Sequence, residues 1–443
     1  MTVTPDLIAS LVQKQYDELP LKRKPVVRDN GLHEWVPLSG IVAQGRDNKL
    51  YCLSLATGMK CLPSSKLSQA QGNVLHDWHA EVLAIRAFNR FVLDECKSLA
   101  QNDSQSSEFL RPRTKDELSS SPRSGDGDGD GVWHGQPFTW REDVLLHMYC
   151  SEAPCGDASM ELTMASQEDA TPWAIPPLTT ITTPTNNSTS SPSPLPAQSK
   201  PQAPAPALPG RAFFSNLGII RRKPSRPDAP RTLSKSCSDK LALKQCTSLL
   251  SGPTSLLVAP DNCYIHTLVL PASQHSPSGC RRAFSGEGRM GSLGAASEEK
   301  LKWQGGYSFR PFTVETTTLE FRFSKREVAA RAQKTTASNL AAAWTRTGLE
   351  EATLGGVLQG RKQFDARGAS FASRRRIWAL AAKVAGLLGV GGVDEVRRVL
   401  GAGTYGEVKG AELLRARRRV KEVVTQQALK GWVRNSGDED FTL

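Results

Sequence analysis

The chain has 443 residues, and its 56 Lys and Arg against 44 Asp and Glu give a formal net charge of +12. A basic excess of this size favours a polyanionic partner, such as a nucleic acid. The nine cysteines show no tight pairing pattern, and the N-terminus has neither a signal-like segment nor an apolar stretch that could span a membrane, which argues against a disulfide-rich secreted protein or a membrane protein. We therefore expect an intracellular protein, in the nucleus, the cytoplasm or both.

Three stretches of biased composition interrupt the chain. Residues 101–131 contain a Gly-Asp repeat, residues 167–208 are rich in Ser, Thr, Pro and Ala, and residues 273–300 carry a weaker bias. Such segments cannot bury enough apolar surface to offset the entropy of ordering them. We expect the first two to be disordered inserts and the third to be a flexible loop. Although the length alone suggests two or three domains, the chain then forms a single domain over residues 1–443.

The N-terminal part predicts a hairpin followed by a helix. Residues 39–43 and 50–55 are short, apolar-rich runs separated by a polar turn, which is the pattern of two antiparallel strands. Apolar residues then recur at helical spacing, at Val82, Leu83, Ile85, Phe88 and Val92. His79 and Glu81 are therefore expected at or near the N-terminus of this helix.

Two further predicted elements begin beside a cysteine. Residues 144–149 have the pattern of a buried strand, and Pro154 and Cys155 after it suggest a helix start with proline in the first turn. Ser236, directly before Cys237, can cap another helix. Three helix N-termini would then meet at one place, where their positive dipole ends favour thiolates.

His79, Cys155 and Cys237 are the residues that we expect to bind a catalytic zinc ion. A histidine and two cysteines can hold zinc with one position left open for water. Glu81 has the place of the general acid/base in the H-x-E signature of nucleobase deaminases, where the carboxylate moves protons. In the compact signature both cysteines come from one P-C-x-x-C run, but residue 158 is alanine. The second thiolate must therefore come from elsewhere, and Cys237 is the best candidate.

Cys52 and Cys150 are the competing thiols. Cys150 could form a C-x4-C pair with Cys155. Both competitors lie within predicted strands, where a cysteine is more often a small buried hydrophobic residue than a ligand. We expect both to belong to the core.

The order of three motifs resembles one enzyme family. A His-Ala-Glu run, a Pro-Cys-Gly-Asp-Ala run and a distant Ser-Cys-Ser-Asp-Lys run at residues 236–240 resemble the adenosine-to-inosine RNA deaminases, and most closely the tRNA-specific type. Further similar segments are residues 57–61, 217–221, 228–230, 358–362, 373–376 and 431–433. The resemblance implies an α/β fold with a cytidine-deaminase-like three-layer α/β/α core and a C-terminal helical elaboration. It also implies Zn²⁺ on His79, Cys155 and Cys237, with Glu81 as the catalytic residue.

The same resemblance implies a structural inositol hexakisphosphate in the core. The positions similar to its binding site are Lys60, Asp77, Arg86, Lys240, Tyr405, Lys409, Arg419 and Trp432. A buried polyphosphate needs many paired cations, because an unpaired charge in a dry interior is very costly. The sequence departs from relatives that edit messenger RNA at Ile85, where they have an arginine, and at Leu243 and Lys244, where they have an Arg-Trp pair.

The implied function is hydrolytic deamination of adenosine to inosine in tRNA, at the adenosine 3′ of the anticodon in alanine tRNA. A double-stranded-RNA editor is a second hypothesis, but such editors usually carry separate RNA-binding modules and His79 lies close to the start of this chain. A non-catalytic scaffold that binds RNA or inositol phosphate has no need of Glu81. A free-nucleoside deaminase explains neither the charge nor the separated cysteines. We expect no membrane association and no obligate protein partner.

Overall fold

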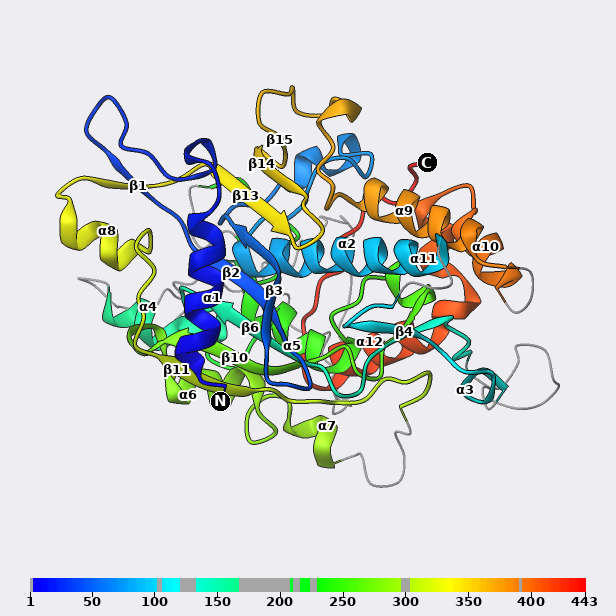
Figure 1. The fold of residues 1–443 in the computed structure, drawn as a ribbon. Coiled ribbons are helices and arrows are strands. Elements are labelled where there is room, and N and C mark those ends of the chain that lie inside the picture. Colours follow the sequence, from blue (N-terminus) through cyan, green and yellow to red (C-terminus); the bar gives the residue numbers. More distant parts are fainter. Residues whose placement is uncertain are drawn as a thin grey trace, which may run out of the picture.

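An eight-stranded mixed sheet forms the centre of the protein (Figure 1). The computed structural model describes residues 3–101, 106–119, 133–166, 208–209, 216–223, 229–295, 303–389 and 393–443. In spatial order the strands are β11 (Thr313–Thr317), β10 (Ile265–Pro271), β6 (Leu145–Cys150), β2 (Leu38–Gln44), β3 (Leu50–Thr57), β13 (Leu340–Thr345), β14 (Glu350–Leu354) and β15 (Val357–Leu358). Strand β10 runs parallel to β6 and β11, and the other neighbours pair antiparallel.

Strands β2 and β3 are the predicted hairpin. They pair antiparallel from Leu38 opposite Thr57 to Gln44 opposite Leu50. The turn closes with a hydrogen bond from Gly45 N to Lys49 O at 2.9 Å. Both strands are buried along nearly their whole length, because helices cover the sheet on both sides.

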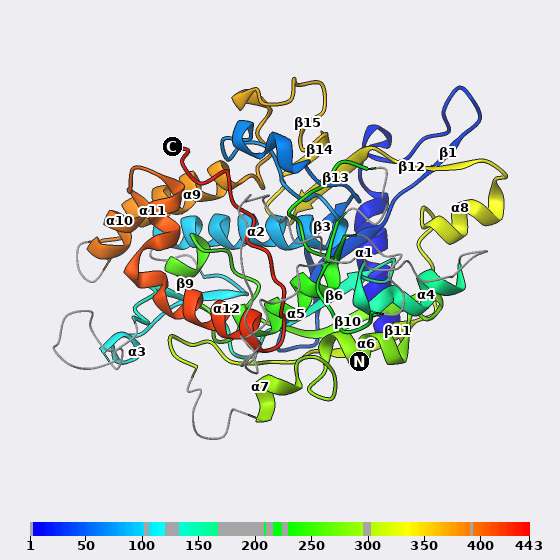
Figure 2. The same ribbon diagram turned by 180° about the vertical axis from the view of Figure 1, so that it is seen from behind.

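Helices on both faces give the sheet the predicted three-layer α/β/α arrangement. Helix α1 (Pro5–Asp17) packs on one face and α2 (Ala80–Gln101) on the other, as opposite views of the ribbon show (Figures 1 and 2). The two successive residues Ile41 and Val42 of β2 belong to different core clusters, the first with α2 and the second with α1. This is the alternation that a sheet buried on both faces requires.

C-terminal helices form the predicted elaboration at one end of the core, next to α2 (Figure 2). They are α9 (Arg374–Leu387), α10 (Asp394–Leu400), α11 (Tyr405–Gly410) and α12 (Arg415–Gln427). Helix α9 packs on α2, and α12 packs on α5 (Cys237–Thr247). The last helices of the chain are therefore built onto the elements that carry the predicted metal ligands.

The expected insert at 101–131 is wrong for its central part. Residues 106–119 contain β4 (Leu110–Pro112) and α3 (Lys115–Ser119), and β4 pairs with β5 (Phe138–Trp140). Phe109 is only 4% exposed. Its ring packs against Tyr51, Phe91 and Trp140, so a few apolar residues in a polar stretch order the segment. Residues 102–105 and 120–132 lie outside the described part of the chain. So do residues 167–207, which make up all of the second expected insert except Leu208.

The expected flexible loop at 273–300 is also wrong as far as residue 295. Helices α6 (Pro277–Phe284) and α7 (Gly291–Ala295) occupy it. Phe284 and Met290 are buried in the main core. Arg282 pairs with Asp157 at 3.1 Å. Composition misled the prediction, because the glycines and serines of this stretch lie between well-packed apolar residues.

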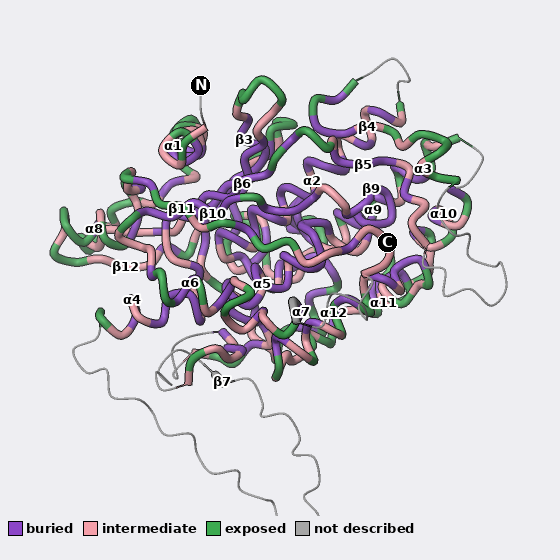
Figure 3. Tube along the Cα trace, turned by 90° about the horizontal axis from the view of Figure 1, so that it is seen from below, coloured by how far each residue is buried: buried purple, intermediate pink, exposed green. Residues whose placement is uncertain are grey.

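Burial is concentrated in the central strands and in α5, whereas α3 and α8 (Lys325–Arg331) are largely exposed (Figure 3). Among the described residues, no helix combines the length and the apolar character needed to cross a membrane. The core is therefore centred on the sheet.

Candidate active site

His79 is fixed by the first turn of α2. Ala80 N donates a hydrogen bond to Gly58 O at 2.9 Å, and Leu83 N donates to His79 O at 2.8 Å. Gly58 has a φ of +136°, and a side chain there would overlap the Trp78 carbonyl oxygen. Glycine at 58 therefore allows the end of β3 to approach the start of α2, which places His79 where the sequence predicted.

Cys155 and Cys237 meet through a second close approach. Cys237 N donates to the Cys155 sulfur at 3.3 Å, and Ser238 N donates to Cys155 O at 3.0 Å. Between the two segments lies Gly156, with a φ of +109°, where a Cβ would overlap the Ser236 side chain. Any larger residue at 156 would push the two cysteines apart.

The two helix starts predicted beside these cysteines differ. Ser236 caps α5 as expected, since its hydroxyl accepts a hydrogen bond from Asp239 N at 3.1 Å. The helix start predicted at Pro154 and Cys155 is wrong: the chain forms a loop there, and the 3-10 turn Asp157–Ser159 begins only after Gly156. The left-handed backbone at Gly156 prevents a helix from passing through it.

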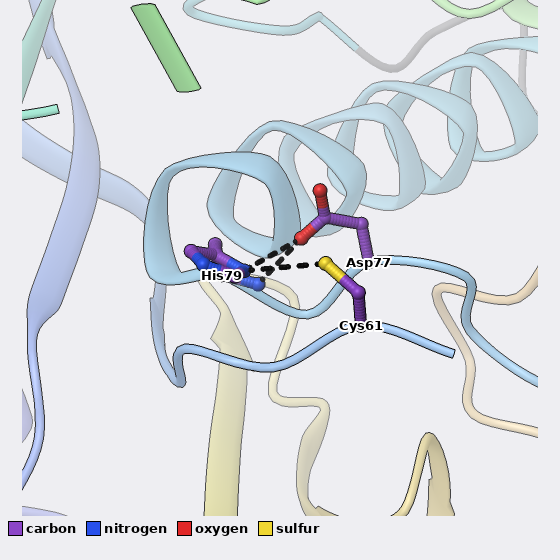
Figure 4. Close-up of side chains that lie close together, drawn as sticks. All are labelled: Cys61, Asp77 and His79. Atoms are coloured by element: carbon purple, nitrogen blue, oxygen red, sulfur yellow. Dashed lines mark hydrogen bonds and ion pairs between the residues drawn. The ribbon is translucent and has the colours of Figure 1, made fainter. Parts of the chain in front are cut away.

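Asp77 orients His79 by a hydrogen bond (Figure 4). The Nδ1 atom of His79 lies 2.9 Å from Asp77 Oδ1 and 3.7 Å from the Cys61 sulfur. Such a carboxylate partner fixes the imidazole tautomer and leaves Nε2 free to bind a metal. The ligand atoms of Cys61, Asp77 and His79 lie within 4.8 Å of one another, so this trio is itself a possible metal-binding group.

Lys223 connects the two halves of the site and was missed by sequence reasoning. Its Nζ donates to Asp77 Oδ2 at 2.9 Å and lies 3.2 Å from the Cys237 sulfur. The second carboxylate oxygen of Asp77 also accepts hydrogen bonds from Ser234 Oγ, at 2.5 Å, and from Lys240 Nζ. Lys223 belongs to a short basic run, and nothing local distinguishes it from a solvated lysine.

The charged groups in this network stabilise one another's ionised forms. Burial alone would raise the pKa of Asp77, but Lys223, Lys240 and His79 hold that pKa well below its usual value. Burial opposes the charged form of Lys223 as well, yet Asp77 and the thiolates raise its pKa. Asp77 and Lys223, which are both less than a tenth exposed, therefore stay ionised because they are paired with each other.

The two thiols form a pair of unequal acidity. A hydrogen bond from Cys237 lowers the pKa of Cys155 well below its ordinary value, and Lys223 and His79 add to this effect. Burial and the neighbouring Cys155 raise the pKa of Cys237. The competing thiols behave as predicted for core residues: Cys52 and Cys150 are 2% and 1% exposed in β3 and β6, and burial raises the pKa of Cys52 to about 12.

Glu81 is a buried carboxyl residue of the same site, close enough to Cys155 and His79 to be affected by their charges. It is 7% exposed, in the first turn of α2. Burial raises the pKa of Glu81, and the Cys155 thiolate raises it further. Such an environment stabilises the protonated form of the carboxyl group, which a general acid/base must form and lose during the reaction.

Behind this site lies a cluster of basic side chains, which we call the cation cluster. It comprises Arg86, Lys235, Lys244, Arg374, Lys409, Arg417 and Lys421. Desolvation and repulsion from Arg374 lower the pKa of Lys409 to about 8. Desolvation and repulsion from Lys409 lower the pKa of Lys421 to about 8 as well.

Two members of the cation cluster have a carboxylate partner. Arg374 lies 3.5 Å from Asp438, and Lys409 lies 3.9 Å from Glu439. Within the described part of the chain the other members make no ion pair: Arg86, Lys235, Lys244, Arg417 and Lys421. Trp432 lies beside the cluster, with the Nζ atoms of Lys235 and Lys421 4.9 and 5.8 Å from the centre of its ring.

Two residues expected at an inositol phosphate site do not lie with the others. Lys60 hydrogen-bonds Asn339, and the charged groups that act on it are Arg28 and Glu34. Arg419 and Lys421 are both exposed on α12, but Lys421 interacts with Lys409, Arg417 and the Trp432 ring of the cluster. Helical periodicity explains this, since residues four apart share a face and the residue between them does not. Arg86 and Lys409 belong to the cluster, and Asp77, Lys240, Tyr405 and Trp432 border it.

The donor set suits zinc. One imidazole and two thiolates are ligands that tetrahedral Zn²⁺ prefers, and three protein ligands leave one position for water. The acidified Cys155 thiol and the nearby Lys223 ammonium favour the deprotonated sulfur that a metal requires. The arrangement can therefore perform metal-assisted hydrolysis with Glu81 as the proton carrier.

Comparison with known proteins places these features in context. Residues 54–436 match the adenosine-deaminase (editase) domain. The chain is similar to the tRNA-specific adenosine deaminase 1 of Schizosaccharomyces pombe, with 36% identity over 341 residues, which cover 76% of this chain and 74% of that protein. The enzyme of the same name from Saccharomyces cerevisiae is 32% identical over 247 residues, 55% of this chain and 53% of that protein. The double-stranded RNA-specific editase B2 of Rattus norvegicus is 31% identical over 160 residues, 35% of this chain and 18% of that protein.

Proposed function

Because this chain belongs to the adenosine-deaminase (editase) domain family, we propose that it is a zinc-dependent enzyme that deaminates adenosine to inosine in tRNA. We propose further that its target is the adenosine 3′ of the anticodon in alanine tRNA. The observation that carries the proposal is the convergence of His79, Cys155 and Cys237 around a network that includes the buried Glu81.

The proposed chemistry divides between the metal and Glu81. His79, Cys155 and Cys237 would hold the zinc, which when bound supplies a hydrolytic nucleophile at neutral pH. Glu81 takes a proton from the attacking water, passes it to the ring nitrogen of adenine and then helps ammonia leave. Asp77 keeps the His79 ring oriented. The positive charge of Lys223 compensates the negative charges of the Asp77 carboxylate and the Cys237 thiolate.

Three features support tRNA as the substrate. The S. pombe and S. cerevisiae relatives are both tRNA-specific adenosine deaminases. The net charge of +12 suits a polyanionic substrate. A target base must also leave its stack to reach a buried site, which costs least in an unpaired loop and so favours an anticodon loop over a continuous duplex.

We also infer that the cation cluster binds inositol hexakisphosphate. Its support is the set of cations that have no carboxylate partner, among which desolvation lowers the pKa of Lys235 to about 7 and that of Lys244 well below its usual value. A polyphosphate would pair these groups and restore their full charge. We assign the contacts to the cation cluster, with Lys240, Tyr405 and Trp432 at its border, and not to Lys60 and Arg419.

Parallel assays on three substrates test the proposed activity. Purified protein would be incubated with alanine tRNA, with a long RNA duplex and with free adenosine, and inosine would be measured in each. We expect inosine chiefly at one adenosine beside the anticodon of alanine tRNA. Inosine formed mainly in the duplex would instead assign the chain to double-stranded-RNA editing, and no inosine in any arm would favour a non-catalytic scaffold.

Phosphate analysis tests the inositol hexakisphosphate proposal separately. Nucleic-acid-free protein would be denatured after extensive dialysis, and the released small molecules identified by mass spectrometry. We expect about one inositol hexakisphosphate per chain. Active protein that contains no inositol phosphate would overturn this part of the proposal without affecting the assignment of the reaction.

A further inference from the structure

A pocket on the α1 face of the sheet contains two histidines that the proposed reaction does not use. Its volume is about 640 Å³, and its walls include Gln44, His147, His266 and Glu315 together with the start of α1. His147 belongs to β6, and His266 belongs to the adjacent strand β10. The pocket lies at the amino end of these parallel strands, whereas Cys155 follows the carboxyl end of β6.

His147 presents a lone pair in a defined position. It is 4% exposed, and its Nε2 lies 2.9 Å from Gln44 Oε1. Because an amide oxygen only accepts hydrogen bonds, Nε2 must carry the proton and Nδ1 must be the unprotonated nitrogen. Within the described part of the chain, this buried Nδ1 has no hydrogen-bond partner. Burial, aided by repulsion from His266, lowers the pKa of His147 to about 4, so the ring is neutral at physiological pH.

A bulge in β10 brings the second histidine to the first. Leu146 and His147 are successive in β6, but their partners Ile265 and Thr267 in β10 are separated by one extra residue, His266. In a regular strand His266 would face away from its neighbour Thr267. The bulge instead leaves the centres of the His266 and His147 rings 5.9 Å apart, with the ring planes at 85°. Bulges are a common means of re-aiming one side chain at a functional site.

We propose that this pocket binds a divalent transition-metal ion through His147 and His266, with the Glu315 carboxylate as a further ligand. Neutral imidazoles and a carboxylate are donors that Zn²⁺ and Co²⁺ accept. A hydrogen bond from the second ring nitrogen to an oxygen acceptor is the usual support of a metal-binding histidine, and Gln44 provides it for His147. His266 and Glu315 are exposed, so both side chains can turn toward an entering ion.

Cobalt titration distinguishes this site from the proposed catalytic site. Metal-free Cys155→Ala protein lacks a thiolate ligand of the catalytic site and would be titrated with Co²⁺ alone. We expect one equivalent to bind with visible ligand-field bands and without the near-ultraviolet sulfur-to-cobalt charge-transfer band. The unmodified chain should bind two equivalents and show both signals. The pocket site thus has a readout that does not depend on the proposed function.

Variants of the pocket complete the test. In the Cys155→Ala background, His266→Gln and His147→Gln should each abolish the cobalt equivalent, while His275→Gln, outside the pocket, should retain it. His266 is exposed, so its variant tests the proposal even if replacement of the buried His147 disturbs folding. No bound cobalt in the Cys155→Ala protein, or full binding by the His266→Gln variant, would overturn the proposal.

Discussion

Asp77 balances the charges of the candidate active site. One carboxylate oxygen accepts from the His79 ring, and the other accepts from Lys223 and Lys240. The same residue thereby connects the metal side of the site with the lysines that lead to the cation cluster. Its position two residues before His79 means that the turn into α2 fixes ligand and orienting carboxylate together.

Replacement of Glu81 by glutamine should abolish turnover and spare the metal. The amide keeps the shape of the side chain but cannot carry a proton, and general acid/base catalysis is worth about 10²- to 10⁴-fold. Single-turnover inosine formation and zinc content would be measured together. Glu95→Gln, on the same helix α2, is the matched control and should keep the rate. Activity of Glu81→Gln within a few-fold of the parent would show that another group moves the proton.

Replacement of Cys237 by alanine should remove the catalytic zinc and the activity. A site with three protein ligands has none to spare, and Cys237 lies at the start of α5 against Cys155. Zinc per chain, measured by elemental analysis in a His266→Gln background so that the pocket site does not contribute, should fall to near zero, whereas the control Cys52→Ala in the same background, in the buried part of β3, should retain it. Full zinc retention in Cys237→Ala would point to another thiol, such as Cys61, whose sulfur lies 3.7 Å from His79 Nδ1.

At this scale the sequence predicts the residues that have motifs and misses those that act through them. His79, Glu81, Cys155 and Cys237 stand in recognisable runs, and in the structure Cys155 contacts Cys237 directly while Lys223 and Asp77 connect Cys237 to His79. Lys223 has no such run, because its role arises only when a distant Asp77 is folded against it. The sequence predicts Arg419 instead of its neighbours Arg417 and Lys421, because the rotation of α12 about its axis is set by packing and cannot be read from the basic run.

Elements follow from the sequence where a periodic apolar pattern is strong. The β2–β3 hairpin, α2 and the cap of α5 form where the pattern predicts them. Residues 106–119 and 273–295 do not follow their composition, because packing of single residues such as Phe109 and Phe284 outweighs a local bias toward disorder. Local composition cannot report such long-range contacts.

Phe109→Ala should therefore be strongly destabilising. Its ring lies 5.3, 5.5 and 5.9 Å from those of Tyr51, Phe91 and Trp140, and loss of a buried aromatic side chain costs about 3–5 kcal/mol. Denaturant unfolding would measure the difference. Leu118→Ala, in the same segment but 37% exposed, is the control and should change the free energy of unfolding by less than about 0.5 kcal/mol. A loss of less than about 0.5 kcal/mol for Phe109→Ala would instead support a disordered insert at this segment.

For the whole molecule, inositol hexakisphosphate should stabilise the fold more at pH 7 than at pH 9. The pKa values of Lys409 and Lys421, lowered by desolvation to about 8, leave both groups charged at pH 7 and mostly neutral at pH 9. Lysine in the unfolded chain titrates near 10.5. Between about pH 8 and 10.5 the ligand-free fold therefore binds fewer protons than the unfolded chain, so the stability of the ligand-free fold rises with pH. The stabilisation by the anion falls over the same range, because the two lysines lose their charge.

Thermal unfolding of ligand-stripped protein, with and without added inositol hexakisphosphate, would measure this difference at both pH values. The paired variant Lys409→Met with Lys421→Met should lose most of the shift in midpoint at pH 7. The control Arg419→Ala, on the exposed face of α12, should keep it. Equal stabilisation at pH 7 and pH 9 would contradict the role given to these two lysines.

Sequencing of tRNA from cells that lack this chain tests the proposed function most directly. Inosine is read as guanosine after reverse transcription, so a change from inosine to adenosine identifies the substrate without any assumption about the isoacceptor. We predict that alanine tRNA retains adenosine 3′ of its anticodon in these cells, and that the unmodified chain, but not its Glu81→Gln variant, restores inosine there. Unchanged inosine at this position in cells without the chain would contradict the account.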